Sequence, residues 1–127
     1  MNVKTNLYYT QDHEWAEING DSVTVGISDH AQAQLGDIVF VELPEVGNTV
    51  KIGDALGVVE STKAVSDFYS PAEGTVTDVN TSLTDSPENI NQDPYGKAWL
   101  VKIKFTKKSP ELMDSKTYEN YLKEEHK

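Results

Sequence analysis

The chain has 127 residues, of which 37% are hydrophobic and 25% are charged, a composition typical of a folded globular protein. Acidic residues outnumber basic ones by 21 to 11, and the formal charge of −10 repels phosphate backbones and argues against nucleic acid as a partner. There is no cysteine, which excludes disulfides, thiolate catalysis and thiolate-bound metals. No apolar run approaches the roughly 20 residues that a membrane span needs, and the first residues lack the layout of a signal peptide. We therefore expect a cytoplasmic protein that has no membrane partner.

The first part of the chain has the alternation of short β-strands. From about residue 8 to residue 106 the pattern predicts a mainly β body. Val23, Val25 and Ile27 alternate with other residues and predict a strand with one buried face. Asn19-Gly20 precedes this strand, and because both residues tolerate the positive φ of a tight turn, the pair predicts a hairpin.

A short helix is predicted after this strand. Ser28 or Asp29 can cap its first turn, good helix formers follow, and Gly36 can end it after about two turns. Residues 37–47 are rich in β-branched and aromatic residues and predict another strand, which is ended by Pro44.

Three closely spaced glycines, Gly47, Gly53 and Gly57, follow. This spacing predicts tight turns between short, sharply bent strands, because glycine adopts backbone conformations that other residues avoid. A further strand is predicted through Val76 and Val79.

The chain then becomes polar before a last strand. Residues 81–98 are rich in turn-forming residues and predict a long loop. Residues 99–105 predict the final strand, with Lys102 and Lys104 on its solvent side.

The C-terminal segment is predicted to be helical at about residues 110–126. Ser109 suits the N-cap, Pro110 the first helical position and Glu111 the first turn. The helix carries a narrow apolar stripe at positions i, i+3 and i+4, namely Tyr118, Tyr121 and Leu122. We expect this stripe to pack against the β body rather than to bind a partner. The whole of 1–127 is then a single domain, expected to be a monomer.

No catalytic or metal-binding constellation is evident. The three histidines, His13, His30 and His126, are scattered along the chain and are expected to be structural or solvated. The zinc-protease helix motif, a phosphate-binding loop, a dinucleotide fingerprint and a nucleophile elbow are all missing. The sequence therefore predicts neither a metal site nor catalytic residues, and an autonomous enzyme is not expected.

Lys63 stands apart because of its surroundings. Residues 56–59 predict one strand and residues 64–69 its return, so Lys63 falls near the turn and projects into solvent. A lysine amine is cationic and weakly nucleophilic at neutral pH, and nearby Glu60 and Asp67 favour the charged form. This argues against an amine catalyst, which needs a desolvated lysine. Two alternatives remain open, an inert surface lysine and an attachment point that another enzyme acylates.

The segment "GDALGVVESTKAVSDFYSPAEGTV" resembles the lysine hairpin of lipoyl and biotinyl domains. Thr62 and Ala64 flank the lysine, where biotinyl domains typically have methionines, so the lipoyl type is favoured. "HEW", "VGISDHAQAQLGDIVFVELPEVG", "VESTKAVSDFYSP" and "INQDPYGKAWLVKIK" occur in the order typical of the H proteins of the glycine cleavage system. The chain is thus similar to that family from about Tyr8 to the terminal helix.

This resemblance implies a fold and a modification. The family is a barrel-sandwich hybrid of two small antiparallel sheets, here with a short internal helix and a C-terminal helix. It implies that Lys63 carries lipoate in an amide bond, as N6-lipoyllysine. The family has no catalytic activity of its own; the cofactor supplies the chemistry and the protein positions it.

The resemblance also implies partners in glycine catabolism and one-carbon metabolism. Glycine decarboxylase (P protein) loads an aminomethyl group, aminomethyltransferase (T protein) receives it, and dihydrolipoamide dehydrogenase (L protein) reoxidises the arm. A lipoate–protein ligase or a lipoyl/octanoyl transferase attaches the group. The alternative is a relay protein that delivers lipoyl groups to other complexes.

Three acidic residues match positions with roles in the family. Glu60 is implied in recognition by the lipoylating enzyme. Glu14 and Asp67 match positions that help to hold the loaded arm, and a carboxylate there suits an ammonium-like group. Exposed carboxylates are common, so a purely structural role for both stays open, as does a plain β domain in which Lys63 is inert.

Overall fold

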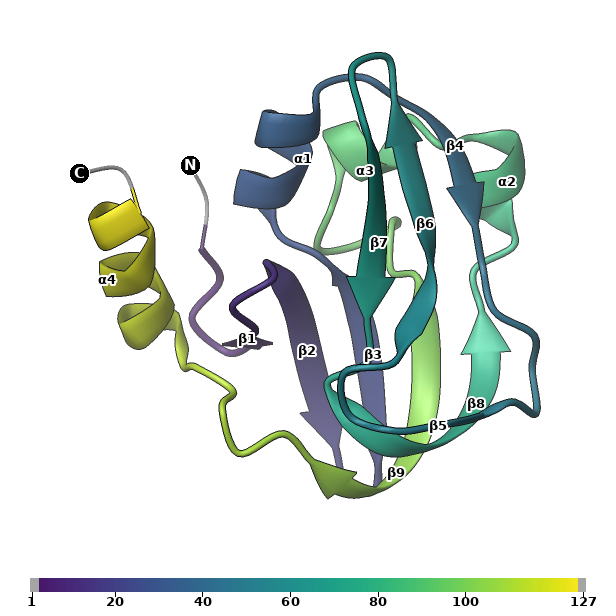
Figure 1. Cartoon of the computed structure of the whole chain (residues 1–127), viewed down its shortest axis with the longest axis vertical. Helices are drawn as coiled ribbons and strands as arrows, with labels where there is room; N and C mark the ends of the chain where they lie inside the picture. Colours follow the sequence, from purple (N-terminus) through teal and green to yellow (C-terminus); the bar gives the residue numbers. More distant parts are fainter. Residues whose placement is uncertain (1–2, 126–127) are drawn as a thin grey trace.

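The computed structural model describes residues 3–125, and its strands form two antiparallel sheets. In the larger sheet the order is β1 (Tyr8–Tyr9), β2 (Glu14–Asn19), β3 (Ser22–Ile27), β9 (Val101–Lys108), β8 (Ala72–Val79) and β5 (Thr49–Val50). In the smaller sheet it is β4 (Ile38–Glu42), β6 (Ala55–Ser61) and β7 (Val65–Tyr69). The helices are α1 (Asp29–Leu35), α2 (Ser82–Asp85), α3 (Asn89–Gln92) and α4 (Ser115–Glu125). The smaller sheet lies in front of the larger one in Figure 1.

The core lies between the two sheets. Val25 and Ile103 of the larger sheet and Val59 and Phe68 of the smaller one belong to the same buried cluster, each at most 1% exposed. Burying these apolar side chains is the main favourable contribution to folding. The predicted mainly β architecture of two small antiparallel sheets is confirmed and agrees with a barrel-sandwich hybrid.

The first hairpin forms as predicted. Asn19 pairs with Ser22 across β2 and β3, and Gly20, with φ of +60°, supplies the turn conformation that β-carbons disfavour. The alternating residues of β3 are buried, with exposed fractions of 2%, 0% and 6% for Val23, Val25 and Ile27.

Local capping defines α1. Ser28, rather than Asp29, is the N-cap, and its Oγ accepts a hydrogen bond from the Ala31 amide at 3.2 Å. Gly36 ends the helix with φ of +82°, and its amide donates to the Gln32 carbonyl. The predicted helix and its end are therefore confirmed.

The three glycines differ in role. Gly47 and Gly53 have φ values of +97° and +88° and form turns, as predicted. The prediction for Gly57 is wrong, because this residue lies inside β6. A β-carbon there would collide with the Glu42 carbonyl oxygen of the neighbouring β4, so Gly57 permits close strand approach rather than a turn.

The prediction of one long loop at residues 81–98 needs correction. Two single-turn helices, α2 and α3, form within it. Each places one apolar side chain, Leu83 or Ile90, in the core at 0% exposure. One apolar residue per turn is too sparse a pattern to stand out in a polar sequence.

The C-terminal helix begins later than predicted, at Ser115. Asp114 caps it, because its Oδ1 accepts a hydrogen bond from the Thr117 amide at 2.8 Å, and this bond lowers the pKa of the carboxyl. Ser109 instead accepts from the Glu111 amide in the connection before the helix. Residue 126, the predicted end, lies outside the described residues.

Aromatic packing holds α4 on the β body, as expected. Tyr118 is 0% exposed, and its ring stacks on Tyr9 of β1 with centroids 4.3 Å apart. Tyr121 and Leu122 complete the contact as half-buried neighbours. Within residues 3–125, no helix combines the length and the apolar character needed to cross a membrane.

Candidate functional site

Lys63 lies at the tip of the hairpin formed by β6 and β7, as predicted. Glu60 pairs with Val65 as the last rung, and the Ser61 amide donates to the Ala64 carbonyl at 2.8 Å. The hairpin tip projects beyond the rest of the body (Figure 1), and Lys63 is exposed. The tip therefore presents the amine to solvent.

Ser61 shapes this turn, a role that the sequence analysis missed. Its side chain is buried at 6% exposure. The Ser61 Oγ accepts hydrogen bonds from the Lys63 amide at 3.2 Å and from the Ala64 amide at 3.0 Å. Serine commonly stabilises turns in this way, so these bonds fix the backbone of Lys63.

A second element holds the hairpin tip from the side. The Thr62 amide donates to the Asp37 carbonyl at 3.1 Å, which ties the tip to the connection between α1 and β4. A β-carbon added to Gly36 would lie 3.0 Å from Lys63 Cε. The aliphatic stem of Lys63 thus lies against Gly36, where a larger residue would crowd it.

Asn91 of α3 in turn holds that connection. Its Oδ1 accepts a hydrogen bond from the Ile38 amide at 2.9 Å. Its Nδ2 donates to the Gly36 carbonyl at 2.8 Å and to Gln32 Oε1 at 3.0 Å. The segment predicted to be a polar loop therefore supports the residues against which Lys63 lies, and only the folded chain reveals it.

Replacing Asn91 with alanine is expected to lower the free energy of unfolding by about 2 kcal/mol, because the Ile38 amide and the Gly36 carbonyl lose their side-chain partner. Chemical denaturation measures this change, and hydrogen exchange at the Thr62 amide is expected to become faster. Gln92→Ala, at the exposed neighbouring position of α3, is the matched control. Equal stability of the two variants would contradict the supporting role of Asn91.

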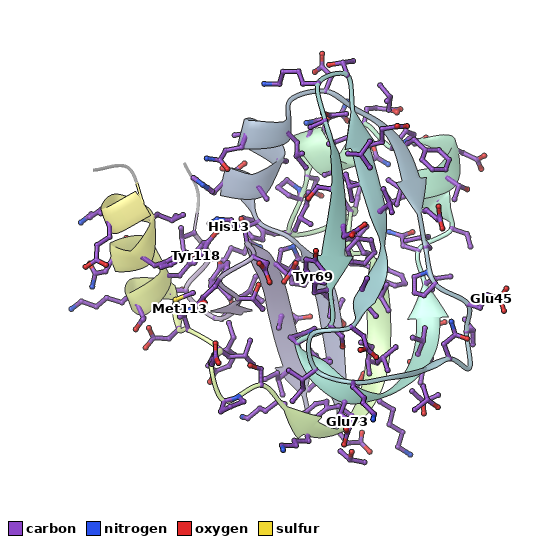
Figure 2. All side chains as sticks on the ribbon, viewed as in Figure 1. His13, Glu45, Tyr69, Glu73, Met113 and Tyr118 are labelled. Carbon is purple, nitrogen blue, oxygen red and sulfur yellow. The ribbon has the colours of Figure 1, made fainter. Side chains whose placement is uncertain are left out.

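A cleft of about 180 Å³ opens between the end of β7 and the segment before β2. Its walls include Glu14 of β2 and Tyr69 of β7, the second of which is labelled in Figure 2. Asp12 and Glu111 add acidic groups. The cleft is therefore small and acidic, which suits a cationic group.

Glu14 is buried in the wall of this cleft, at 2% exposure. Its Oε1 accepts a hydrogen bond from Thr10 Oγ1 at 2.5 Å, and its Oε2 accepts one from the Tyr69 amide at 3.2 Å. Burial raises the pKa of the carboxyl to about 7, and these hydrogen bonds offset only part of the shift. Glu14 therefore titrates near neutral pH, a property common at functional sites.

Asp67 and Glu60 lie elsewhere, on the outer face of the smaller sheet. Asp67 pairs with Val58 and is exposed, and it is not among the residues that line the cleft. Glu60 is half-buried on β6, just before the tip. The fold thus brings Glu14 together with Tyr69 in the cleft. Asp67 and Glu60 lie outside the cleft, on the outer face of the sheet whose hairpin carries Lys63.

His13 and His30, although far apart in the sequence, lie next to each other in the structure. Their rings lie 4.6 Å apart, and His13 Nδ1 and Ser28 Oγ each lie 2.8 Å from the Tyr118 hydroxyl. Figure 2 shows His13 and Tyr118 facing each other between the β body and α4, so this cluster anchors the helix. His126 lies outside the described residues. In residues 3–125, no cluster of three histidine or acidic side chains is arranged to hold a metal ion.

A two-sheet body that presents one lysine on a supported tip, with an acidic cleft at the far end of β7, has the form of a carrier domain for a covalently attached group. The comparisons with known proteins specify which carrier. The family model for the glycine cleavage H-protein matches residues 7–125.

Individual relatives agree. The chain is 54% identical over 123 residues to the glycine cleavage system H protein of Rubrobacter xylanophilus, with 97% of each chain covered. It is 56% identical over 125 residues to the probable glycine cleavage system H protein of Pyrococcus horikoshii, covering 95% of this chain and 92% of the other. The crystal structure of a glycine cleavage system H protein from Mycobacterium marinum superposes with a TM-score of 0.88 at 43% identity, over 98% of this chain and all of the other.

The chain therefore belongs to the glycine cleavage H-protein family. This membership confirms the predicted resemblance and supports a lipoyl-carrier role in glycine cleavage.

Proposed function

We propose that this protein is the lipoyl-carrying shuttle of the glycine cleavage system and that Lys63 is its attachment site. The observation that carries the proposal is the exposed Lys63 at a hairpin tip that Ser61 and Asp37 hold in place, in a chain of this family. A supported tip limits the backbone entropy that is lost when an enzyme docks there.

Attachment joins Lys63 Nζ to the carbonyl carbon of an activated lipoyl donor. With a lipoate–protein ligase the donor is the lipoyl adenylate, so the C–N amide bond forms, the C–O bond to AMP breaks, and the amine gives up its proton. A lipoyl/octanoyl transferase achieves the same exchange from a carrier thioester. The chain contributes an accessible amine and Glu60, which we propose is read by the attaching enzyme.

Once attached, a lipoyl group would supply disulfide–dithiol chemistry for carrying an aminomethyl group between glycine decarboxylase and the aminomethyltransferase. Dihydrolipoamide dehydrogenase, whose flavin would take up the two electrons of the dithiol, is the third proposed partner. The chain itself is proposed to be non-catalytic. Its contribution is to tether the arm, which gives each partner a high effective concentration of substrate.

Glu14 is proposed to hold the cationic end of the loaded arm. A carboxylate buried at 2% exposure attracts an ammonium more strongly than one in water, and pairing with that cation offsets the cost of ionising Glu14. Asp67 is exposed on β7, two residues before Tyr69 of the cleft. We propose that it guides the arm along this strand.

The direct test is glycine-dependent exchange of carbon dioxide, catalysed by purified glycine decarboxylase. Protein that has been acylated with lipoate, ATP and a lipoate–protein ligase is expected to support exchange, whereas unacylated protein is expected to support none. Acylated protein that supports no exchange, yet donates its acyl group to another lipoyl domain, would replace the shuttle by the relay function.

A further inference from the structure

The outer face of the smaller sheet carries an exposed apolar patch beside Lys63. Val39, Phe40 and Val65, called here the tip patch, are 51%, 50% and 63% exposed. Among the residues that the structure describes, only Tyr8 and Val46 are other large hydrophobic residues with comparable exposure. Exposed apolar side chains that gather in one place are typical of interaction sites.

Strand register explains why these residues gather. Phe40 of β4 pairs with Glu60 of β6, which pairs with Val65 of β7. Directly paired residues of neighbouring strands point to the same face of a sheet, so the three side chains form one row across it. Val39 lies at the irregularity in β4 between Ile38 and Phe40, beside that row.

The side chains of this row do not pack in the core, because the inner face of the sheet is formed by their neighbours along the strands. Val41 and Val59, each next to a member of the row along its strand, are 2% and 1% exposed. Because successive residues of a strand point to opposite faces, Phe40 and Glu60 point outward, away from the core. Phe40 therefore lies on the solvent face of the sheet, where packing of the core does not require an aromatic side chain.

The charges around the tip patch have one sign. The next row across the sheet is Glu42, Val58 and Asp67, and Glu60 lies within the patch row. Across β4, β6, β7 and the hairpin tip, Lys63 is the only basic residue. The face thus offers apolar side chains on either side of Glu60, with two further acids, Glu42 and Asp67, in the next row.

We propose that this face is the docking site of the enzyme that acylates Lys63, and that the enzyme presents apolar contacts to Phe40 and Val65 and basic side chains to Glu60 and the acids of the next row. The inference rests on the proposed function, because it takes Lys63 as the acceptor amine. Val65 lies two residues from Lys63 and Glu60 three, so an enzyme that forms a bond at Lys63 Nζ approaches the β6–β7 end of this row. Enzymes that act on the far end of an attached arm have no such requirement, which favours the acylating enzyme as the occupant.

The test measures docking apart from chemistry. The double variant Phe40→Ser/Val65→Ser is acylated by a purified lipoate–protein ligase with lipoate and ATP, and intact mass gives initial rates. The KM of the variant as a substrate and the Kd of its unacylated form for the ligase are both expected to rise about tenfold. An increase of this size is typical when apolar contacts in an interface are lost. The kcat is expected to change little. Because both side chains are at least half exposed, the melting temperature is expected to stay close to that of wild type.

Val46→Ser is the matched control. Val46 is 59% exposed but lies in the connection between β4 and β5, next to Glu45, which Figure 2 places away from the hairpin tip. Glu42→Gln is expected to slow association and to weaken its dependence on salt, whereas Glu45→Gln leaves both unchanged.

The outcomes separate the two proposals. A KM and Kd of the double variant within twofold of those of Val46→Ser would overturn the docking site but leave Lys63 as the acceptor. Wild-type protein that the ligase binds but does not acylate would refute the proposed function itself. A wild-type dimer that Phe40→Ser dissociates in sedimentation experiments would assign the patch to a second copy of this chain and overturn the docking site.

Discussion

Lys63→Arg is expected to abolish acylation completely and to leave the fold intact. Arginine keeps the positive charge and a long aliphatic stem, but its guanidinium stays protonated and offers no nucleophilic nitrogen. Lys63 is exposed, and exposed substitutions commonly change stability by no more than about 0.5 kcal/mol. Intact mass after incubation with lipoate, ATP and a lipoate–protein ligase measures the loss, and thermal unfolding checks the fold.

Lys51→Arg is the matched control, because Lys51 is an exposed lysine in a turn remote from the hairpin tip. It is expected to be acylated as fully as wild type. A lipoyl-sized gain of mass in Lys63→Arg would show that another lysine accepts the group and would end the assignment of Lys63.

The free energy of unfolding of Glu14→Gln relative to wild type is expected to be roughly 3 kcal/mol higher at alkaline pH than at pH 4.5. The pKa of Glu14 is about 7 in the folded protein against an ordinary value of 4.5, so the folded state holds this proton more tightly than the unfolded state. The contribution of Glu14 is therefore most favourable below pH 4.5, declines as pH rises to 7, and is constant above that. Glutamine carries no titrating proton, which removes this decline.

The amide also suits the site. Its oxygen can accept the Tyr69 amide bond that Glu14 Oε2 accepts at 3.2 Å, and its nitrogen can donate to Thr10 Oγ1. Chemical denaturation of wild type and variant at several pH values between 4.5 and 8 measures the difference. Glu17→Gln, on the exposed side of the same β2 strand, should show no such dependence. Parallel stability curves for wild type and Glu14→Gln would contradict the raised pKa.

Glu14→Gln also tests the proposed holding role. The neutral side chain keeps the shape of the cleft wall but removes its attraction for a cation, so ammonia is expected to leave the loaded arm faster. In wild type, the same release is expected to slow as pH rises and Glu14 ionises, at a pH below the pKa of about 7 of the unloaded protein, because the cation of the loaded arm favours the carboxylate. An unchanged release rate in the variant would leave Glu14 with a structural role only.

Patterns that depend on a few neighbouring residues were predicted well. Ser28 begins α1 and Gly36 ends it, Gly20 forms the turn of the first hairpin, and Lys63 lies at the tip of the β6–β7 hairpin. Each follows from backbone preferences and alternation that neighbouring residues express by themselves. The start of α4 was mispredicted because Ser109 and Asp114 both resemble a cap, and the Tyr9–Met113 bridge keeps the chain extended between them.

Motifs and turns that are local in the chain identify the family, the hairpin and the lysine at its tip. Which groups surround that lysine and where the acids lie depends instead on tertiary packing. Asn91 reaches Ile38 across 53 positions, and Glu14 meets the Tyr69 amide across 55. The raised pKa of Glu14 and the shared face of Phe40 and Val65 likewise depend on burial and strand register. Burial and register arise when distant segments pack, so no local pattern contains them.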